Sequence, residues 1–239
     1  MEAVILAGGQ GTRLAPYTNG VPKALVSVCG RPVIEILLHR LKLAGVTKVH
    51  IAVSHLAYQI KSVLGDGERF GLQIVYSEES EPLSTVGPLT LIPSLPDEFL
   101  VANADVLTDL DLKLLYARHR ESHCKLTVAT YHRTERMDYG VLQAAGDGRV
   151  TAFSEKPEYR FSVSMGVYVF SRSVLEYVPR GARFGFDDLM LTLLKKNEPI
   201  NTCPYEGFWL DIGRPDDYER ANTTDSDSIR QLFSRSIKS

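Results

Sequence analysis

The sequence lacks a long apolar run and an excess of charge of either sign. Its apolar stretches fall far short of the roughly 20 residues that a membrane span needs, and its N-terminus carries no basic leader segment. Its 27 basic and 29 acidic residues give a formal net charge of −2 without a long basic run. Neither a membrane nor a nucleic acid is therefore expected as a partner, and the composition favours a small charged ligand.

The chain also has few cysteines, and they form no pattern. Cys29, Cys124 and Cys203 are isolated, odd in number and without the spacing of metal ligands. This arrangement argues against a disulfide scaffold and against a zinc site. We expect free thiols, a reducing compartment and a soluble cytoplasmic protein.

No linker rich in proline, glycine or serine divides the chain, so a single α/β domain is expected. In its first half, β-rich runs alternate with amphipathic helical segments, a rhythm that predicts parallel βαβ units with both faces of the sheet covered. The expected strands are residues 3–7, 49–53, 73–76 and 99–102, and the expected helices are 34–44, 57–64 and 112–121.

The second half changes rhythm, because expected strands follow one another with few helices between them. This pattern predicts mixed or antiparallel pairing. The expected strands are residues 126–131, 140–143, 149–153 and 166–170, and helices are expected at 172–178, at 187–196 and after Pro215. We expect a catalytic domain over residues 1–222, with a nucleotide-binding first half and an acceptor-binding second half. Residues 223–239 are expected to be a polar tail or a loose helix.

The stretch "AVILAGGQGTRLAPYTNGVPKAL" places three glycines, an arginine and a lysine directly after the first expected strand. Open α/β sheets bind ligands at this edge, and glycine leaves main-chain N–H groups exposed to a phosphate. The spacing fits neither the dinucleotide fingerprint, which needs a third glycine where Leu14 stands, nor a P-loop. The glycines alone leave a tight turn open as an alternative, and the charges of Arg13 and Lys23 favour a phosphate ligand.

The same stretch resembles the signature of the sugar-1-phosphate nucleotidyltransferases, also called NDP-sugar pyrophosphorylases. Further segments follow in the order of that family: "SEPLSTVGPL", "VANADVLTDLD", "SEKP", "SMGVYVFS", "FGFDDLM" and "GFWLDIGRPDDY". The resemblance covers nearly the whole chain. It implies a Rossmann-like, GT-A-type three-layer α/β fold with a mixed, mostly parallel central sheet. It also implies transfer of a nucleotidyl group from a nucleoside triphosphate to a sugar 1-phosphate, usually with Mg²⁺.

The resemblance assigns roles to particular residues. Arg13 and Lys23 are the expected catalytic residues, on the leaving pyrophosphate and near the α-phosphate respectively. Asp105 and Asp211 are the expected magnesium ligands. The expected nucleotide-binding residues are Leu6, Ala7, Gly8, Gly9, Gly11, Thr12, Arg13, Ser84, Thr85, Gly87 and Asn103. The expected sugar-phosphate-binding residues are Tyr139, Gly140, Glu155, Lys156, Ser164 and Gly166.

Four other acids are interpreted as helix-cap or turn residues and are left outside the site: Asp109, Asp111, Asp187 and Asp188. An exposed pair such as Glu155 and Lys156 is ordinarily solvated surface, and its assignment to the sugar depends on the resemblance.

The base and the sugar are less strongly indicated than the reaction. Ser84, Thr85 and Gly87 stand where guanylyl-type members carry a glycine-threonine-alanine-glycine run, and they do not resemble the thymidylyl-type "GLAQA" run. This favours GTP. Mannose, heptose or octose 1-phosphate is the expected acceptor, with glucose 1-phosphate as an alternative. The chain departs from the family pattern at Ala15, Ala104 and Ser164, which bears on the identity of the sugar.

Two functions of other classes remain as alternatives: a non-catalytic subunit that binds an NDP-sugar, and an unrelated nucleotide-binding oxidoreductase. The first predicts loss of Lys23 or of a metal-binding aspartate, and all are present. The missing third glycine disfavours the second. The partners expected are a nucleoside triphosphate and a sugar 1-phosphate, with a homodimer left open.

Overall fold

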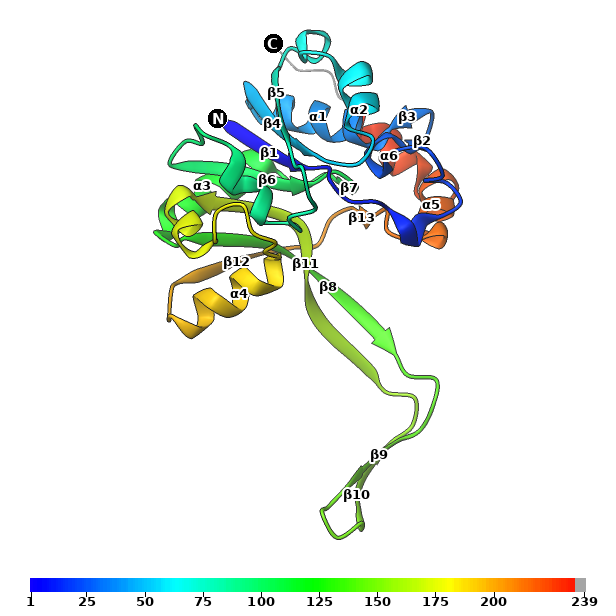
Figure 1. Ribbon diagram of the computed structural model, residues 1–239. Coiled ribbons are helices and arrows are strands. Elements are labelled where there is room, and N and C mark those ends of the chain that lie inside the picture. Colours follow the sequence, from blue (N-terminus) through cyan, green and yellow to red (C-terminus); the bar gives the residue numbers. More distant parts are fainter. Residues whose placement is uncertain (235–239) are drawn as a thin grey trace.

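A computed structural model describes residues 1–234, and its centre is a seven-stranded sheet (Figure 1). The strands in spatial order are β12 (Ile200–Tyr205), β8 (Leu126–Arg136), β11 (Glu158–Ser171), β6 (Glu98–Asn103), β1 (Glu2–Leu6), β4 (Lys48–Val53) and β5 (Gln73–Glu78). β11 runs antiparallel to both of its neighbours, and every other pair is parallel. The expected mixed, mostly parallel sheet is confirmed.

Helices cover both faces of this sheet, as expected. The α-helices are α1 (Val33–Leu43), α2 (Ala57–Leu64), α3 (Leu112–Ser122), α4 (Phe186–Lys195), α5 (Pro215–Asn222) and α6 (Ser226–Ser234). The 3-10 helices are η1 (Thr12–Leu14), η2 (Lys23–Leu25), η3 (Glu68–Phe70), η4 (Gly87–Leu91) and η5 (Arg172–Tyr177). Within residues 1–234, no helix has the length and apolar character that crossing a membrane requires.

Alternation along the strands divides the core into two layers. On β1, Ile5 faces a cluster with Leu38 of α1 and Ile60 of α2, and Val4 faces the opposite cluster. That opposite cluster contains residues of α4, η4 and η5, among them Leu189. Successive side chains of a strand point to opposite faces of the sheet, so one strand contributes to both clusters. The three-layer prediction is confirmed.

The end of the described chain is a packed helix, where a polar tail or a loose helix was expected. α6 packs against α1, and it buries Ile229 and Leu232 with exposed fractions of 0% and 2%. These side chains join a third cluster that also includes Leu210 of the short strand β13 (Trp209–Asp211). The polar composition of this segment concealed an amphipathic helix, because two buried positions are sufficient to dock it. Residues 235–239 of the expected tail lie outside the described part of the chain.

The second half also differs from expectation in the length of its strands. β8 continues to Arg136 and β11 begins at Glu158, so both run well past the ends predicted from their apolar residues. Between them lie β9 (Val141–Ala144) and β10 (Val150–Ser154), which form a separate two-stranded hairpin. The polar ends of β8 and β11 escaped prediction because side chains exposed on both faces give no alternating pattern. The expected helix at 172–178 is the 3-10 helix η5.

Three short strands complete the fold. β7 (Val106–Thr108) pairs with β13 in an antiparallel ladder, and β2 (Ser27–Val28) pairs with β3 (Arg31–Pro32). The β7–β13 pair joins chain segments about a hundred residues apart, since Asp211 lies opposite Val106. This pairing brings the two predicted metal ligands into one neighbourhood.

Candidate active site

The loop after β1 forms one wall of a cavity at the carboxyl edge of the parallel strands. β1 is buried through Val4 and Ile5, and the Ala7 N–H still donates to the Ala52 carbonyl at 2.8 Å. The chain then leaves the sheet as the glycine loop and returns through η1. A ligand site at this edge is the arrangement that open α/β sheets favour.

Two of the loop glycines are required by the surrounding structure. Gly11 has a φ of +67°, and a β-carbon there would lie 3.0 Å from Cβ of Lys23. At Gly8 a β-carbon would overlap the carboxylate of Glu79. A side chain at either position would therefore displace a polar residue of the cavity.

The cavity has a volume of about 420 Å³, which is within the usual range for small-molecule sites. Twelve of the predicted site residues line it, namely Leu6, Ala7, Gly8, Gly9, Gly11, Thr12, Arg13, Lys23, Ser84, Thr85, Asn103 and Asp105. Gln10, Ala24, Ala52, Glu79, Pro82, Pro88, Ala104 and Gly213 also line it and were not predicted as site residues.

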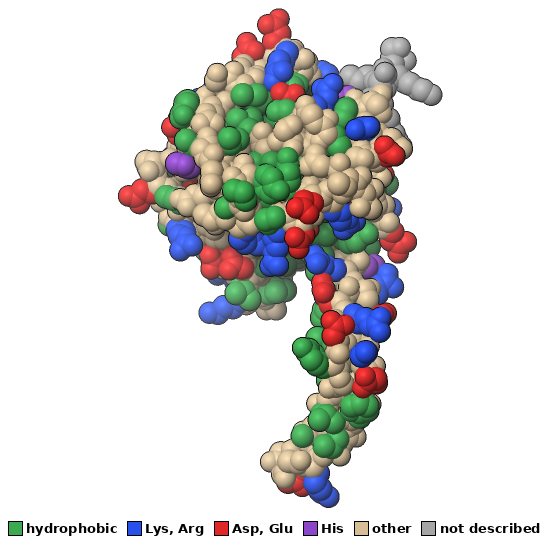
Figure 2. Space-filling model, turned by 90° about the vertical axis from the view of Figure 1, so that its right-hand side faces the viewer, with side chains coloured by type: hydrophobic (Ala, Val, Ile, Leu, Met, Phe, Trp, Pro, Cys, Tyr) green, Lys and Arg blue, Asp and Glu red, His purple; other side chains and the backbone are tan. Residues whose placement is uncertain are grey.

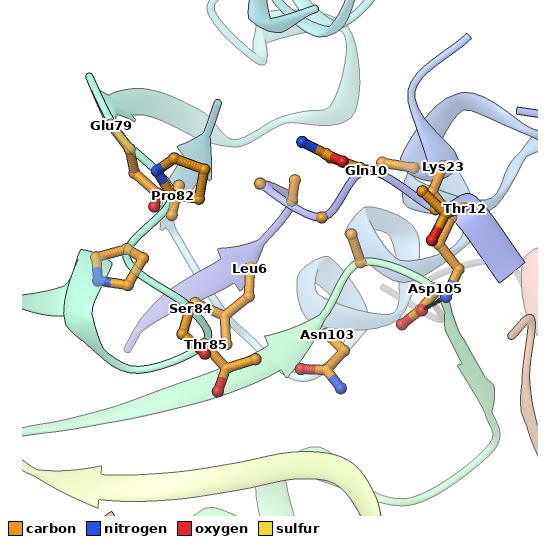
Figure 3. A pocket seen from close by; sticks show the side chains of 18 of the residues that line it. Leu6, Gln10, Thr12, Lys23, Glu79, Pro82, Ser84, Thr85, Asn103 and Asp105 are labelled. Atoms are coloured by element: carbon orange, nitrogen blue, oxygen red, sulfur yellow. Dashed lines mark hydrogen bonds and ion pairs between the residues drawn. The ribbon is translucent and has the colours of Figure 1, made fainter. Parts of the chain in front are cut away.

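The two ends of this cavity differ in chemistry (Figure 3). Glu79, Pro82, Ser84 and Thr85 lie at one end, and Lys23 and Asp105 lie at the other, with the glycine loop between them. One end therefore offers small polar groups and proline rings, and the other offers fixed charges. Such a division suits an elongated ligand with a flat polar group at one end and anionic groups at the other.

At the charged end, Lys23 forms an ion pair with Asp105. Both side chains are largely buried, each with an exposed fraction of 16%. Lys23 begins η2 directly after Pro22, which fixes the backbone where the lysine enters the cavity. Arg13 lines the same cavity and is exposed, and no salt bridge found within residues 1–234 includes it. Its charge is available to a ligand.

Asp211 lies beside Asp105 because of the β7–β13 pairing. The Ile212 N–H donates to the Asp105 carbonyl at 3.1 Å, which joins the two segments next to both carboxylates. Burial and the neighbouring Asp105 charge raise the pKa of the Asp211 carboxyl, and Lys23 opposes that shift. The Asp211 Oδ1 atom is buried and has no hydrogen-bond partner in the described structure. A buried carboxylate oxygen without a partner is suited to a cation.

The carboxylate pair has the composition of a partial magnesium site. No group of three or more histidine, cysteine, aspartate or glutamate side chains suited to a metal occurs within residues 1–234. Two carboxylates are nevertheless enough where phosphate oxygens and water complete the six ligands that Mg²⁺ requires. The orphaned Asp211 oxygen and the adjoining Asp105 therefore fit such an ion.

At the opposite end, the segment around Ser84 is tied to the start of α4. The Thr85 hydroxyl accepts the Phe186 N–H at 2.8 Å. Gly87 was expected to bind nucleotide, yet it is buried behind the lining, and its N–H donates to the Phe184 carbonyl at 2.9 Å. A β-carbon at Gly87 would meet the Ala182 carbonyl at 2.5 Å, so this glycine permits close packing of the backbone.

Glu79 is the functional candidate that sequence reasoning missed. It lines the cavity with an exposed fraction of 8%, and its Oε2 accepts the Leu83 N–H at 2.6 Å. Burial raises the pKa of its carboxyl, and the Leu83 hydrogen bond lowers it. The available signal was its place directly after β5, at the same edge as Asp105, because carboxyl ends of parallel strands meet there.

Ser164 and Gly166 lie in β11 at an irregularity of the β8–β11 ladder, and neither lines the cavity. Gly166 has a φ of +74°, and a β-carbon there would lie 2.7 Å from the Asn103 side-chain nitrogen. The Ser164 hydroxyl donates to the Tyr168 oxygen at 3.1 Å. Burial raises the pKa of Tyr168, and the charges of Asp105 and Asp211 raise it further, so this segment adjoins the carboxylate pair.

The other four predicted sugar-phosphate residues lie elsewhere. Tyr139, Gly140, Glu155 and Lys156 are on the hairpin beyond the ends of β8 and β11, and none of them lines the cavity. Tyr139 has an exposed fraction of 76%. The structure thus brings together the predicted nucleotide and metal residues and separates them from most of the predicted acceptor residues.

Two of the four acids interpreted as caps or turn residues, Asp111 and Asp188, are found as helix caps. Asp111 accepts the Leu114 N–H at the start of α3 at 2.9 Å, and Asp188 accepts the Gly185 N–H before α4 at 2.8 Å. Asp109 accepts the Phe208 N–H at 2.8 Å. None of the four acids left outside the site lines the cavity.

Comparison with known proteins decides the family. A model of the nucleotidyl transferase family matches residues 2–228. The chain belongs to this family. The family fold is also that of HddC from Yersinia pseudotuberculosis complexed with GMP-PN, with a TM-score of 0.72 and 25% identity. That match covers 93% of the nucleotidyl transferase described here and 98% of HddC.

Two curated relatives share more sequence with this nucleotidyl transferase. A UTP–glucose-1-phosphate uridylyltransferase of a Synechocystis strain is 34% identical over 100% of this chain and 65% of its own length. A mannose-1-phosphate guanylyltransferase catalytic subunit beta of Drosophila pseudoobscura pseudoobscura is 35% identical over 96% of this chain and 64% of its own length. The nucleotidyl transferase therefore spans just under two thirds of these relatives.

Proposed function

We propose that this nucleotidyl transferase transfers a nucleotidyl group from a nucleoside triphosphate, preferably GTP, to a sugar 1-phosphate. The products are an NDP-sugar and pyrophosphate. One observation carries the proposal: a single cavity joins the glycine loop, the cations Arg13 and Lys23, and the carboxylate Asp105 with Asp211 beside it. This set matches the needs of in-line attack on a phosphate.

Charge repulsion is the main obstacle in this reaction. An oxygen of the sugar phosphate forms a bond to the α-phosphorus while the bond to the β-phosphate oxygen breaks, and pyrophosphate departs with that electron pair. The attacking and leaving groups are both anionic. Lys23 and Arg13 counter this repulsion from fixed positions, and such electrostatic stabilisation, together with positioning, supplies most of the catalysis in phosphoryl transfer.

We propose Mg²⁺ as the cofactor, held by Asp105 and Asp211. When bound, a magnesium ion neutralises charge on the phosphates and fixes their orientation. The orphaned Asp211 oxygen supports this assignment. The chain itself contributes the second cation, since the ammonium group of Lys23 lies against Asp105 and within reach of the same phosphates.

We propose guanine as the preferred base, on the ground of Glu79 at the other end of the cavity. Guanine presents two neighbouring donors on its Watson–Crick edge, N1–H and the amino group, and a carboxylate accepts both. Adenine has an acceptor at N1 and would meet the carboxylate unfavourably. The guanylyltransferase named among the relatives, and the GMP-PN complex of HddC, support this choice.

The uridylyltransferase relative supports an alternative base and glucose 1-phosphate as acceptor. A thymidylyl- or adenylyltransferase and a non-catalytic NDP-sugar-binding subunit also remain alternatives. The acceptor is proposed to be a mannose-, heptose- or octose-type sugar 1-phosphate. A cytoplasmic location and the division into a catalytic domain over residues 1–222 and a C-terminal segment over residues 223–239 stay predictions.

The test is a pyrophosphate-release assay with GTP, ATP, UTP, CTP and dTTP. Each is combined with mannose, glucose and heptose 1-phosphates, in the presence and absence of Mg²⁺. We expect turnover with GTP and one of the sugar phosphates, and none without the metal. Nucleotide binding by calorimetry without turnover for any combination would instead favour the non-catalytic alternative.

A further inference from the structure

A long two-stranded arm projects from the globular body of this protein (Figures 1 and 2). The arm is residues 132–162. It begins where β12 ends, because Tyr205 pairs with Tyr131, and beyond that point β8 has β11 as its one sheet neighbour among the described residues. β8 and β11 continue as a ribbon to Arg136 and Glu158, and the β9–β10 hairpin forms the tip. Its surface carries apolar side chains among charges of both signs.

The ladder of the arm holds its tip away from the chain's own cavity. Pairing is regular from Ser164 opposite Thr130 to Glu158 opposite Arg136. At about 3.3 Å per residue, these strands extend roughly 20 Å beyond the irregularity near Gly166. Accordingly, no residue between 126 and 171 lines the cavity. A ribbon with a regular ladder resists the sharp bend that would bring its tip back to the cavity of the same chain.

The arm exposes an unusual share of apolar surface. Among the described residues, seven of the fifteen exposed large hydrophobic side chains fall between residues 137 and 161. Phe153, Phe161 and Leu142 have exposed fractions of 60%, 50% and 62%. An isolated two-stranded hairpin is at best marginally stable in water, and a concentration of exposed apolar side chains marks an interaction surface. The arm therefore needs a covering surface.

The tip also gathers the four predicted acceptor residues that the cavity lacks. A β-carbon at Gly140 would lie 2.6 Å from the Phe153 ring and 3.1 Å from the Glu155 Oε2. Gly140 thus lets a carboxylate and a ring lie against the backbone next to Tyr139, and Lys156 follows directly. A cationic and a carboxylate residue next to each other in the sequence suit a phosphate and the hydroxyls of a sugar.

We propose that the arm is covered by a second copy of this chain and that two copies exchange arms. Each tip then closes the acceptor side of the partner's cavity. A two-fold axis completes both sites at once, because each chain has one cavity without acceptor residues and one arm bearing them. The arm has the 20 to 30 residues that a stable interface contributes per side. The roles of the tip residues rest on the proposed function, and the exchange of arms does not.

The exchange is tested first without reference to activity. Chains labelled with ¹⁴N and ¹⁵N are mixed under dimer-exchanging conditions and treated with an amine-reactive cross-linker. We expect cross-links between Lys23 and Lys156 that contain one peptide of each label. Cross-links restricted to peptides of a single label would show an arm that folds back on its own chain, and absence of the cross-link would also overturn the proposal.

Sedimentation velocity supplies a second measurement. The wild-type chain should sediment at twice its mass of 26.6 kDa. The double variant Phe153→Ser with Phe161→Ser should sediment as a monomer. Tyr58→Ser is the matched control, since Tyr58 is exposed to 67% on α2, and it should remain dimeric. A monomeric wild type would overturn the proposal.

Complementation tests the shared site. Asp105→Asn disables a cavity and Lys156→Ala disables an arm, so each variant alone should have little activity. In a random mixture half of the dimers are mixed, and each of these has one intact pair, which predicts recovery of about a quarter of wild-type activity. Recovery no greater than the sum of the separate variants would refute the shared site. If the wild type releases no pyrophosphate, the proposed function fails, and the cross-links still decide the arm.

Discussion

The cavity and the arm are held in different ways. Elements far apart in sequence surround the cavity, since its lining runs from Leu6 to Gly213 and includes the buried pair Lys23 and Asp105. The arm is held by a single ladder between two strands. Fixed charges and close packing suit phosphate chemistry, whereas a two-stranded arm suits a contact that forms when another surface covers it.

The largest expected effect is on the cavity. Lys23→Ala and Asp105→Asn should each lower kcat by about a hundredfold or more, which corresponds to about 3 kcal/mol of lost charge stabilisation. Lys61→Ala is the control, because Lys61 also pairs with a carboxylate, that of Glu78, but on the exposed surface outside the cavity. Cavity variants with wild-type kcat would show that the cavity residues do not act on the phosphates.

A smaller effect is expected at the ends of β8 and β11 that lie farthest from the arm. His119 of α3 is 1% exposed, and its ring contacts the hydroxyls of Thr127 on β8 at 2.8 Å and Ser171 on β11 at 3.1 Å. Burial lowers its pKa from 6.5 to about 4. The unfolded chain therefore binds the proton between these two values and the folded chain does not. Stability should fall as the pH is lowered through this window.

The expected loss from this histidine between pH 7.5 and pH 5 is about 2 kcal/mol in the free energy of unfolding. Urea unfolding at the two pH values measures it. His119→Gln keeps a polar side chain toward both hydroxyls and should abolish this part of the pH dependence. An unchanged pH dependence in the variant would assign the effect to other groups.

The smallest expected effect concerns the base end of the cavity. Glu79→Gln replaces two acceptor oxygens by one acceptor and one donor, and the donor would oppose the N1–H of guanine. The ratio of kcat/KM for GTP to that for ATP should fall about tenfold, equivalent to about 1.4 kcal/mol. Glu78→Gln is the control, because Glu78 is the exposed last residue of β5 and does not line the cavity. An unaltered ratio would remove Glu79 from base selection.

Much of the cavity could be predicted because its residues follow strands whose apolar cores are readily recognised. Leu6, Asn103 and Asp105 sit at or just beyond the carboxyl ends of such strands, and position at that edge is a property of the whole fold class. Glu79 follows the same rule and was missed, because the strand was expected to end at residue 76, whereas β5 continues to Glu78. The family resemblance was needed to assign Asp211, whose neighbour Asp105 is remote in sequence.

The two strands at the tip of the arm were predicted, at residues 140–143 and 149–153, whereas the ribbon of β8 and β11 that carries them was not, and the reason is physical. The strands of this ribbon have no apolar face that packs against a core. The alternation of apolar and polar residues therefore ends near Tyr131, although the ladder continues to Arg136. For a related reason the sequence left a polar tail and a loose helix open for the segment of α6, since Ile229 and Leu232 are few among polar neighbours. The spacing of apolar residues in a sequence indicates which side chains are buried against the rest of the chain. It says little about a segment that is exposed, or about one that is docked by only two buried side chains.

The contact between Lys23 and Asp105 implies an exchange of partners within the cavity. A lysine held against a carboxylate leaves neither of these two largely buried charges without an opposite charge beside it. Entry of a metal ion with a polyphosphate would supply Asp105 with a new cation and Lys23 with a new anion at the same moment. Two opposite charges would change partners, and each would remain neutralised throughout. The ion pair thus keeps both reacting groups in place while the cavity awaits its substrates.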